Sequence, residues 1–274
     1  MSKIKAYVLC VYHSPRQLLI HVLFVLVFLY LTAASRQEDV LFENIVRVAR
    51  IQTQGQTDSV FVKQLMVLIN KMMHDRNDIF QNTEHLTFKE KWIHSVDADL
   101  MYGAGSCGGF SKVLARSLKK AGFQVRIGQM LVNHTYGGHI LLETYLPTLH
   151  KWVVMDPLFL LTFTNPQGVW ASFEEVHQNW HFYQTQIQIQ TNYNYHYNYA
   201  GIRYTNWTKI PVLGNLTYQV LKLVKGNEFA ATFSLRPYLL DSYRFFKWVI
   251  AVSYAAFIIL SFILLHKLGR LDGK

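Results

Sequence analysis

The chain has 274 residues, of which 51% are hydrophobic and 16% are charged, and its formal net charge is +10. This length allows one ordinary domain or two small ones, and the apolar composition excludes a plain soluble enzyme because it points to membrane segments. The charge is concentrated near the chain ends, with +3 in residues 1–34, +4 in residues 243–274 and only +3 between them, so we expect no nucleic-acid partner.

Two uncharged apolar segments are long enough to cross a bilayer. Residues 18–34 and residues 248–265 provide 17 and 18 such positions, at the short end of the roughly 17–25 that a membrane helix needs. Basic residues flank both segments, as the positive-inside rule expects of cytoplasmic ends. We predict a two-pass protein of the cell membrane, organised as cytoplasmic residues 1–17, a membrane segment at 18–34, an extracytoplasmic domain at 35–242, a membrane helix at 245–266 and a cytoplasmic tail at 267–274.

The first membrane segment has a second interpretation. The small residues of Tyr30–Ser35 are also typical of a signal-peptide cleavage site, which would make residues 1–34 a removable signal. We favour an uncleaved anchor, because the apolar run exceeds the roughly 7–15 residues of a usual signal core. In the anchored form the two cysteines, Cys10 and Cys107, lie on opposite sides of the membrane, so Cys107 is an unpaired thiol in an exported domain.

Helical periodicity of the apolar residues predicts four helices in the central domain, at Asp39–Ile51, Asp58–Phe80, Ser111–Ala121 and Ser172–Phe182. Gly122 is expected in a left-handed conformation just after the third helix. Ser172 and Glu175 have the spacing of a capping box at the start of the fourth.

Strand-like alternation dominates the second half of the domain. Phe123–Val132 predicts one strand, and Gly138–Pro147 and Lys151–Phe159 predict a β-hairpin. Tyr183–Trp207, rich in Tyr, Asn and Gln, predicts exposed strands that form either a sheet edge packed on the domain or an aromatic sugar-binding platform. The fold class is therefore one α+β domain between two membrane segments.

A glycine-rich stretch surrounds Cys107. Gly103, Gly105 and Gly108 fit the pattern G-x-G-x-x-G, but no strand precedes them and no acidic residue follows at the distance that a ribose contact needs, so a dinucleotide site is excluded. Cys107 instead stands at or just before a helix start, where the helix dipole lowers a thiol pKa. Backbone N–H groups around Gly105 and Gly108 are placed to form an oxyanion hole. A buried core thiol is the alternative.

The predicted hairpin supplies a base and a group to orient it. With a tight turn at Pro147–Thr148, the directly opposite residues are His139 and Asp156, Leu141 and Val154, and Glu143 and Trp152. All six then share one face of the sheet. Opposite Cβ atoms lie about 4.5–5.5 Å apart, which suits an imidazole–carboxylate hydrogen bond.

Three blocks in this order, GSCGGFSKVLARSLKKAGFQVR, GGHILLETYL and KWVVMDPLF, resemble the core of the transglutaminase-like superfamily of papain-like cysteine enzymes. The match spans residues 105–159, about a fifth of the chain, within a motif core at 97–160. The matching positions are Gly105, Cys107, Gly122, Arg126, His139, Glu143, Trp152, Asp156 and Pro157.

This resemblance implies a papain-like core with Cys107 as nucleophile, His139 as its base and Asp156 as the residue that orients the imidazole. An acyl-thioester, formed from a carboxamide or peptide carbonyl, would pass to an amine or to water. The family's upstream oxyanion-hole side chain has no clear match, and Tyr102 and Trp92 are weak candidates. An aromatic residue often follows the histidine in the family, whereas Ile140 follows it here.

Support residues and metal sites complete the prediction. Arg126, Glu143 and Trp152 are expected to be structural, with Arg126 paired to a carboxylate such as Glu143. His177 and His181 have the i, i+4 spacing of metal ligands on a helix, but the glutamate of H-E-x-x-H is absent. We expect neither a metal nor a cofactor.

Three functions follow from the sequence. The first is an outward-facing cysteine acyltransferase. The second is an amidase or protease that acts on cell-envelope peptides. The third is a non-catalytic module that binds glycans or proteins at the membrane. The expected partners are a protein or glycopeptide substrate, the membrane, and proteins of polysaccharide or envelope assembly.

Overall fold

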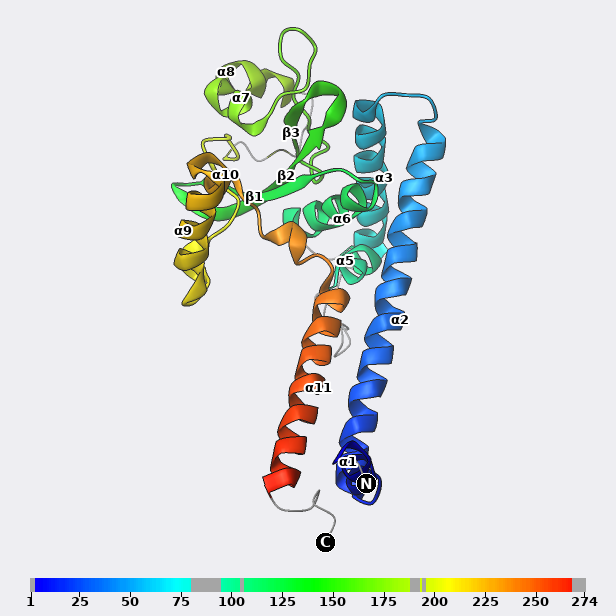
Figure 1. The fold of residues 1–274 in the computed structure, drawn as a ribbon. Helices are drawn as coiled ribbons and strands as arrows, with labels where there is room; N and C mark the ends of the chain where they lie inside the picture. Colours follow the sequence, from blue (N-terminus) through cyan, green and yellow to red (C-terminus); the bar gives the residue numbers. More distant parts are fainter. Residues whose placement is uncertain (1–2, 80–94, 104–105, 188–192, 194–195, 268–274) are drawn as a thin grey trace. The chain divides into compact units, whose positions relative to one another are not determined.

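A computed structural model describes residues 3–79, 95–103, 106–187, 193 and 196–267. The chain divides into two compact units, one formed by Met1–Glu38 together with Asp241–Lys274 and the other by Asp39–Leu240 (Figure 1). The first unit is helical, and the second combines helices with an antiparallel sheet.

The helical unit contains α1 (Lys3–Tyr12), the first part of α2 (Pro15–Gln52) and α11 (Ser242–Lys267). Helices α2 and α11 are long and apolar enough to cross a membrane, and they include the two segments predicted to do so. Aromatic contacts join them: the Tyr254 ring lies 5.1 Å from that of Phe24, and its hydroxyl lies 3.0 Å from Nδ1 of His21. These two helices are compatible with a two-pass membrane protein.

Helix α2 continues without a break into the second unit. The segment Asp39–Ile51, predicted as a separate helix, is therefore the last part of α2. Residues 34–54 contain neither glycine nor proline, so no residue there favours a break in the helix.

The second unit is built on a four-stranded antiparallel sheet with the order β3-β2-β1-β4. The strands are β1 (Val125–Val132), β2 (Thr135–Leu146), β3 (Lys151–Met155) and β4 (Ile202–Arg203). The fold class is thus shown as mixed helix and antiparallel sheet.

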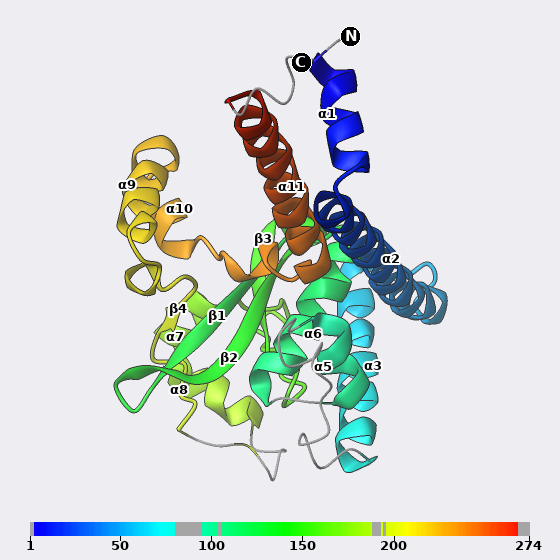
Figure 2. The same cartoon turned by 90° about the horizontal axis from the view of Figure 1, so that it is seen from below.

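Helices cover both faces of this sheet (Figures 1 and 2). One face packs against α6 (Cys107–Lys120), behind which lie α3 (Asp58–Ile79) and α5 (Val96–Tyr102). The other face packs against α7 (Phe173–Gln178), α8 (Trp180–Tyr183) and buried tyrosines of the segment that follows. The described chain also contains α9 (Leu213–Lys225), α10 (Asn227–Thr232) and 3₁₀ turns at Pro147–Leu149, Gln184–Ile187, Trp207–Lys209 and Arg236–Tyr238.

Helix α6 ends as predicted. Gly122 has φ of +98°, a left-handed conformation that a side chain rarely adopts. The N–H of Phe123 donates to the Leu118 carbonyl and that of Gly122 donates to the Lys119 carbonyl, which is the Schellman arrangement. Phe123 then stacks on Phe61 of α3 at 5.8 Å. The glycine therefore turns the chain from α6 directly into β1.

The register of the β2–β3 hairpin differs from the prediction by two residues. Trp152 pairs with Tyr145 and Val154 pairs with Glu143, so the predicted pairs of Leu141 with Val154 and Glu143 with Trp152 are wrong. The cause is a longer connection, in which Pro147–Leu149 forms a 3₁₀ turn and His150 is left-handed. A shift of two keeps each side chain on its predicted face.

In its described part, the Tyr-, Asn- and Gln-rich segment does not form the exposed strands that were predicted. Its described part contains one short strand, β4, and otherwise a 3₁₀ turn and irregular backbone; residues 188–192, 194 and 195 lie outside the described part. Tyr193 and Tyr199 are buried against the sheet, because large aromatic rings gain more from burial than from exposure. The helix predicted at Ser172–Phe182 has its capping box but divides at Asn179 into α7 and α8.

Candidate active site

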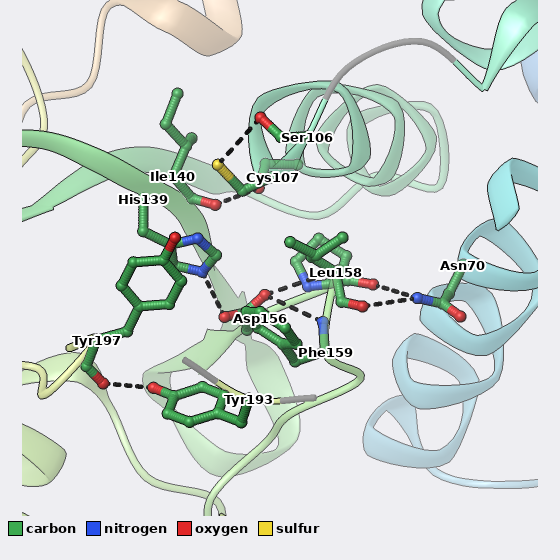
Figure 3. A network of polar contacts seen from close by, with 12 residues as sticks. Asn70, Ser106, Cys107, His139, Ile140, Asp156, Leu158, Phe159, Tyr193 and Tyr197 are labelled. Atoms are coloured by element: carbon green, nitrogen blue, oxygen red, sulfur yellow. Dashed lines mark hydrogen bonds and ion pairs between the residues drawn. The ribbon is translucent and has the colours of Figure 1, made fainter. Parts of the chain in front are cut away.

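His139 and Asp156 form a buried hydrogen-bonded pair. Nε2 of His139 lies 2.6 Å from Oδ2 of Asp156, and both side chains are almost completely inaccessible (Figure 3). His139 is on β2, and Asp156 directly follows β3. Because both side chains keep the predicted face, the pair forms diagonally although the two residues are not directly opposite.

The Asp156 carboxylate is held from behind by the turn that follows it. Its Oδ1 accepts from the N–H groups of Leu158 and Phe159 at 3.2 and 3.4 Å. The Asp156 backbone exchanges two hydrogen bonds with Leu161. These bonds fix the carboxylate so that its other oxygen faces the imidazole.

Asn70 of α3 is a positioning residue that the sequence interpretation missed. Its Nδ2 donates to the carbonyls of Pro157 and Leu158 at 2.7 and 3.1 Å, which ties the turn after Asp156 to the helical layer (Figure 3). The sequence contained one indication of this role, because Asn70 is a single polar residue on the face of α3 that carries the fully buried Met66, Ile69 and Met73. A buried amide needs hydrogen-bond partners.

Cys107 is the first residue of α6 and is buried. Burial raises the pKa of its thiol, but the nearby His139 ring with its positive charge, the Ile140 N–H and the Ser106 hydroxyl together hold the pKa below its ordinary value. The Ser106 hydroxyl lies 3.8 Å from the sulfur. The helix N-terminus acts in the same direction.

The pKa of the His139 imidazole is shifted upward, opposite to that of the thiol. Burial lowers the pKa of His139, but the charge and hydrogen bond of Asp156, with smaller contributions from Cys107, raise it to about 9. Nδ1 of His139 has no hydrogen bond of normal geometry to any described residue and lies on the side of the ring that faces Cys107 (Figure 3). The imidazolium and the thiolate therefore stabilise each other's charged form.

Aromatic rings cover the imidazole. Tyr197 stacks on His139 with ring centroids 4.2 Å apart and planes 14° apart, and Phe159 lies at 5.7 Å. The Tyr193 hydroxyl donates to the Tyr197 carbonyl and fixes this segment (Figure 3). The stacked rings exclude water from the imidazole and favour its charged form through a cation–π interaction. The sequence interpretation missed Tyr197, whose contact joins segments 58 residues apart.

The start of α6 lies close against β2. A Cβ at Gly108 would be 3.3 Å from Cδ1 of Ile140, and the Ser111 hydroxyl donates to the Ile140 carbonyl at 3.0 Å. Gly108 therefore allows the close approach that brings Cys107 next to His139. The other predicted oxyanion supports are not tested, since Gly105 and Trp92 lie outside the described residues, as does the side chain of Tyr102.

Glu143 links the sheet to its covering helix. Its carboxylate accepts from the Phe173 N–H at 2.9 Å and from the Tyr204 hydroxyl. It lies 3.8 Å from Arg126, directly opposite on β1, so the predicted pairing is confirmed. The Arg126 guanidinium also stacks over Trp152 at 3.7 Å. Three of these contacts gather around one carboxylate, four residues along β2 from His139.

His177 and His181 do not share a helix face. The backbone breaks at Asn179 between them. Nδ1 of His177 contacts the Tyr199 carbonyl, and Nδ1 of His181 contacts Gln184. Within the described ranges, no group of three or more His, Cys, Asp or Glu side chains is arranged to hold a metal ion.

The pH dependence of the free energy of unfolding should reveal the His139–Asp156 pair. A histidine whose pKa is raised on folding stabilises the protein fully below its unfolded pKa of about 6.5, and that contribution is lost as the pH rises through about 9. The lowered pKa of Cys107 acts in the opposite sense, because a folded-state thiolate adds stability as the pH rises. The two trends partly cancel in the native protein.

The Cys107→Ser variant isolates the histidine. Its unfolding free energy is expected to fall by about 2 kcal/mol between pH 6 and pH 9.5, as measured by urea unfolding at each pH. Adding Asp156→Asn should flatten this dependence. A pH-independent Cys107→Ser variant would contradict a raised histidine pKa.

Comparison with known proteins gives no relative: no family model, no curated protein and no solved structure matches this chain.

Proposed function

We propose that this protein is a membrane-anchored cysteine acyl-transfer enzyme with a core like that of the transglutaminase-like superfamily. The observation that carries the proposal is a thiol at the first residue of a helix, facing an imidazole that a buried carboxylate holds at 2.6 Å. A nucleophile, its base and an orienting group in this order are what covalent catalysis by cysteine requires.

The geometry supports a two-step reaction. The Cys107 thiolate attacks a carboxamide or peptide carbonyl, a C–S bond forms, and the carbonyl oxygen takes up the negative charge. Free N–H groups in the first turn of α6 bind that oxyanion. Nδ1 of His139 gives its proton to the departing nitrogen, the C–N bond breaks, and a thioester remains.

The second step reverses these roles. The neutral imidazole takes a proton from an amine or from water, which attacks the thioester and releases the thiolate. Asp156 stabilises the imidazolium each time it forms and keeps Nδ1 directed at the sulfur, because its own hydrogen bond occupies Nε2. An amine acceptor gives cross-linking, and water gives hydrolysis of envelope peptides.

We place the catalytic unit outside the cytoplasm, with both chain ends inside. Support comes from the two candidate membrane helices and from the basic residues beside them. Substrates would then be proteins or glycopeptides of the cell envelope. The glycan-binding alternative gains no support from the described tyrosines of the segment, because Tyr193 and Tyr199 are buried and Tyr197 lies on His139.

A labelled primary amine tests the proposal and separates its two branches. The full chain in detergent is incubated with the amine and a glutamine-rich protein such as casein, and both amine incorporation and ammonia release are measured. We expect one or both to occur, and Cys107→Ser to lower the rate by about 1,000-fold or more. Ammonia without incorporation identifies a hydrolase. Equal rates with the native and Cys107→Ser proteins would refute the assignment of the nucleophile.

A further inference from the structure

Two arginines from distant parts of the chain lie on neighbouring segments near the β1 edge of the sheet, which are joined where the Leu235 N–H donates to the Thr205 hydroxyl at 3.0 Å. Arg203 is on β4, and Arg236 begins the 3₁₀ turn Arg236–Tyr238. The Ser234 hydroxyl bonds both to the Ile127 N–H and to the Ile127 carbonyl of β1, and Lys119 of α6 donates to the Pro237 carbonyl. The segment that carries Arg236 therefore lies between α6 and the β1 edge.

The strand register directs Arg203 to the same face of the sheet as α6. Arg203 is directly opposite Gln129 of β1, which is directly opposite Ile140 of β2. Directly opposite residues share a face, and Ile140 packs on that face against Gly108, the residue after Cys107. Arg203 is thus two strands, about 10 Å, from the residue that contacts the start of α6.

Neither guanidinium group has a counter-charge among the residues that the structure describes. Nε of Arg203 and Nη1 of Arg236 are buried and have no hydrogen-bond partner among the described residues. No carboxylate in the described part of the chain forms an ion pair with either arginine, and the recorded contact of the Arg203 guanidinium is with the Tyr136 ring at 4.6 Å. Buried charges in proteins are normally paired, because leaving one unpaired is costly.

The electrostatics connect this pair with the thiol. Burial lowers the pKa of Arg236, the positive charge of Arg203 lowers it further, and the negative charge of Cys107 raises it. The two positive charges therefore repel each other, and the negative charge of the thiolate is near enough to stabilise the Arg236 guanidinium. An anion bound near both guanidinium groups would offset this repulsion.

We propose that Arg203 and Arg236 bind a carboxylate of the substrate beside the carbonyl that Cys107 attacks. This inference rests on the proposed function and deepens it, since it makes the acyl donor an acidic molecule. The planar fork of a guanidinium matches a carboxylate through two parallel hydrogen bonds. Both arginines are only half-buried as whole side chains, so a substrate carboxylate can approach them from solvent, while Nε of Arg203 and Nη1 of Arg236 lie on their inner side.

Two reagents of nearly the same shape test the proposal. Iodoacetate and iodoacetamide both alkylate a thiolate and release iodide, but only iodoacetate carries a carboxylate. The ratio of their rates at one pH is independent of how much thiolate is present. For Cys107 in the full chain, we expect this ratio to exceed that of N-acetylcysteine by about tenfold or more, as two charge-assisted hydrogen bonds allow.

Arginine variants locate the effect. Arg203→Gln and Arg236→Gln should each lower the ratio severalfold, and the double variant should return it to the value of N-acetylcysteine. If the Arg236→Gln variant does not fold, the Arg236→Lys variant, which keeps the positive charge, replaces it in the experiment. The matched control is Arg47→Gln, because Arg47 is exposed and donates to Asn44, and it should leave the ratio unchanged.

The two proposals fail in different ways. Rapid, His139-dependent alkylation by iodoacetamide, with a native ratio no higher than that of N-acetylcysteine, overturns the carboxylate site and leaves the proposed enzyme standing. Iodoacetamide alkylation no faster than for a free thiol and independent of His139 refutes the activated cysteine itself. An unchanged ratio in the Arg203→Gln, Arg236→Gln double variant also overturns the site.

Discussion

Replacing His139 by alanine is expected to move the pH midpoint of Cys107 alkylation upward to about 8.5, the value of an unassisted thiol. In the native protein the imidazolium holds the thiol pKa below its ordinary value, so alkylation should extend to lower pH than for an unassisted thiol. At pH 6 an unassisted thiol is less than about 1% ionised, and although its thiolate is intrinsically more nucleophilic, we expect a loss of rate of about tenfold or more. Iodoacetamide consumption, followed by mass spectrometry of the Cys107 peptide, measures the profile.

Two variants make this result specific. Asp156→Asn retains the ring but removes the charge that raises the pKa of His139, so its profile should lie between the native and alanine profiles. His181→Ala replaces an exposed histidine that contacts Gln184 and should behave as the native protein does. A native midpoint near 8.5, or one that the His139 substitution leaves in place, would show that the imidazole does not activate the thiol.

The histidine–carboxylate pair could be predicted because it requires that both side chains lie on one face of the sheet, and does not require that the two residues be directly opposite. Side chains alternate along a strand, so an error of two residues in the β2–β3 pairing leaves His139 and Asp156 on one face and within reach of each other. The end of α6 before Gly122 follows an equally local rule, whereas the helix predicted from Ser111 begins earlier, at Cys107. The turn between β2 and β3 was predicted wrongly, because a 3₁₀ segment and a left-handed histidine replace the expected two-residue turn.

The parts of the site that escaped prediction are tertiary contacts. Tyr197 lies in a segment whose alternation suggested strands, yet it belongs to no strand and its ring stacks on His139. Asn70 is 87 residues from the carbonyl that it binds, and no local pattern relates a helix on one layer to a turn on another. The arginine pair likewise depends on where β4 and the chain after Ser234 meet β1. Local sequence propensity does not determine which distant segments contact each other, because the packing of the whole unit decides these contacts.

The second large effect is expected at Glu143, whose loss should destabilise the sheet unit by about 3 kcal/mol. Glu143→Ala leaves the Phe173 N–H and the Tyr204 hydroxyl without their acceptor and leaves Arg126 without its carboxylate. For a unit of this size the unfolding temperature should fall by roughly 10 °C. Tryptophan fluorescence on heating reports this unit, since Trp152 stacks directly under Arg126.

A double-mutant cycle separates this network from the general cost of a cavity. Tyr204→Phe alone removes one donor to Glu143 and should cost about 1 kcal/mol. In the Glu143→Ala background the same change should cost much less, because the hydroxyl has already lost its acceptor there. Glu174→Ala is the matched control, since Glu174 is exposed and accepts from Gln178. Additive losses for Glu143→Ala and Tyr204→Phe would show that the carboxylate does not organise this side of the sheet, and β4, which carries Arg203 next to Tyr204, would then need another anchor.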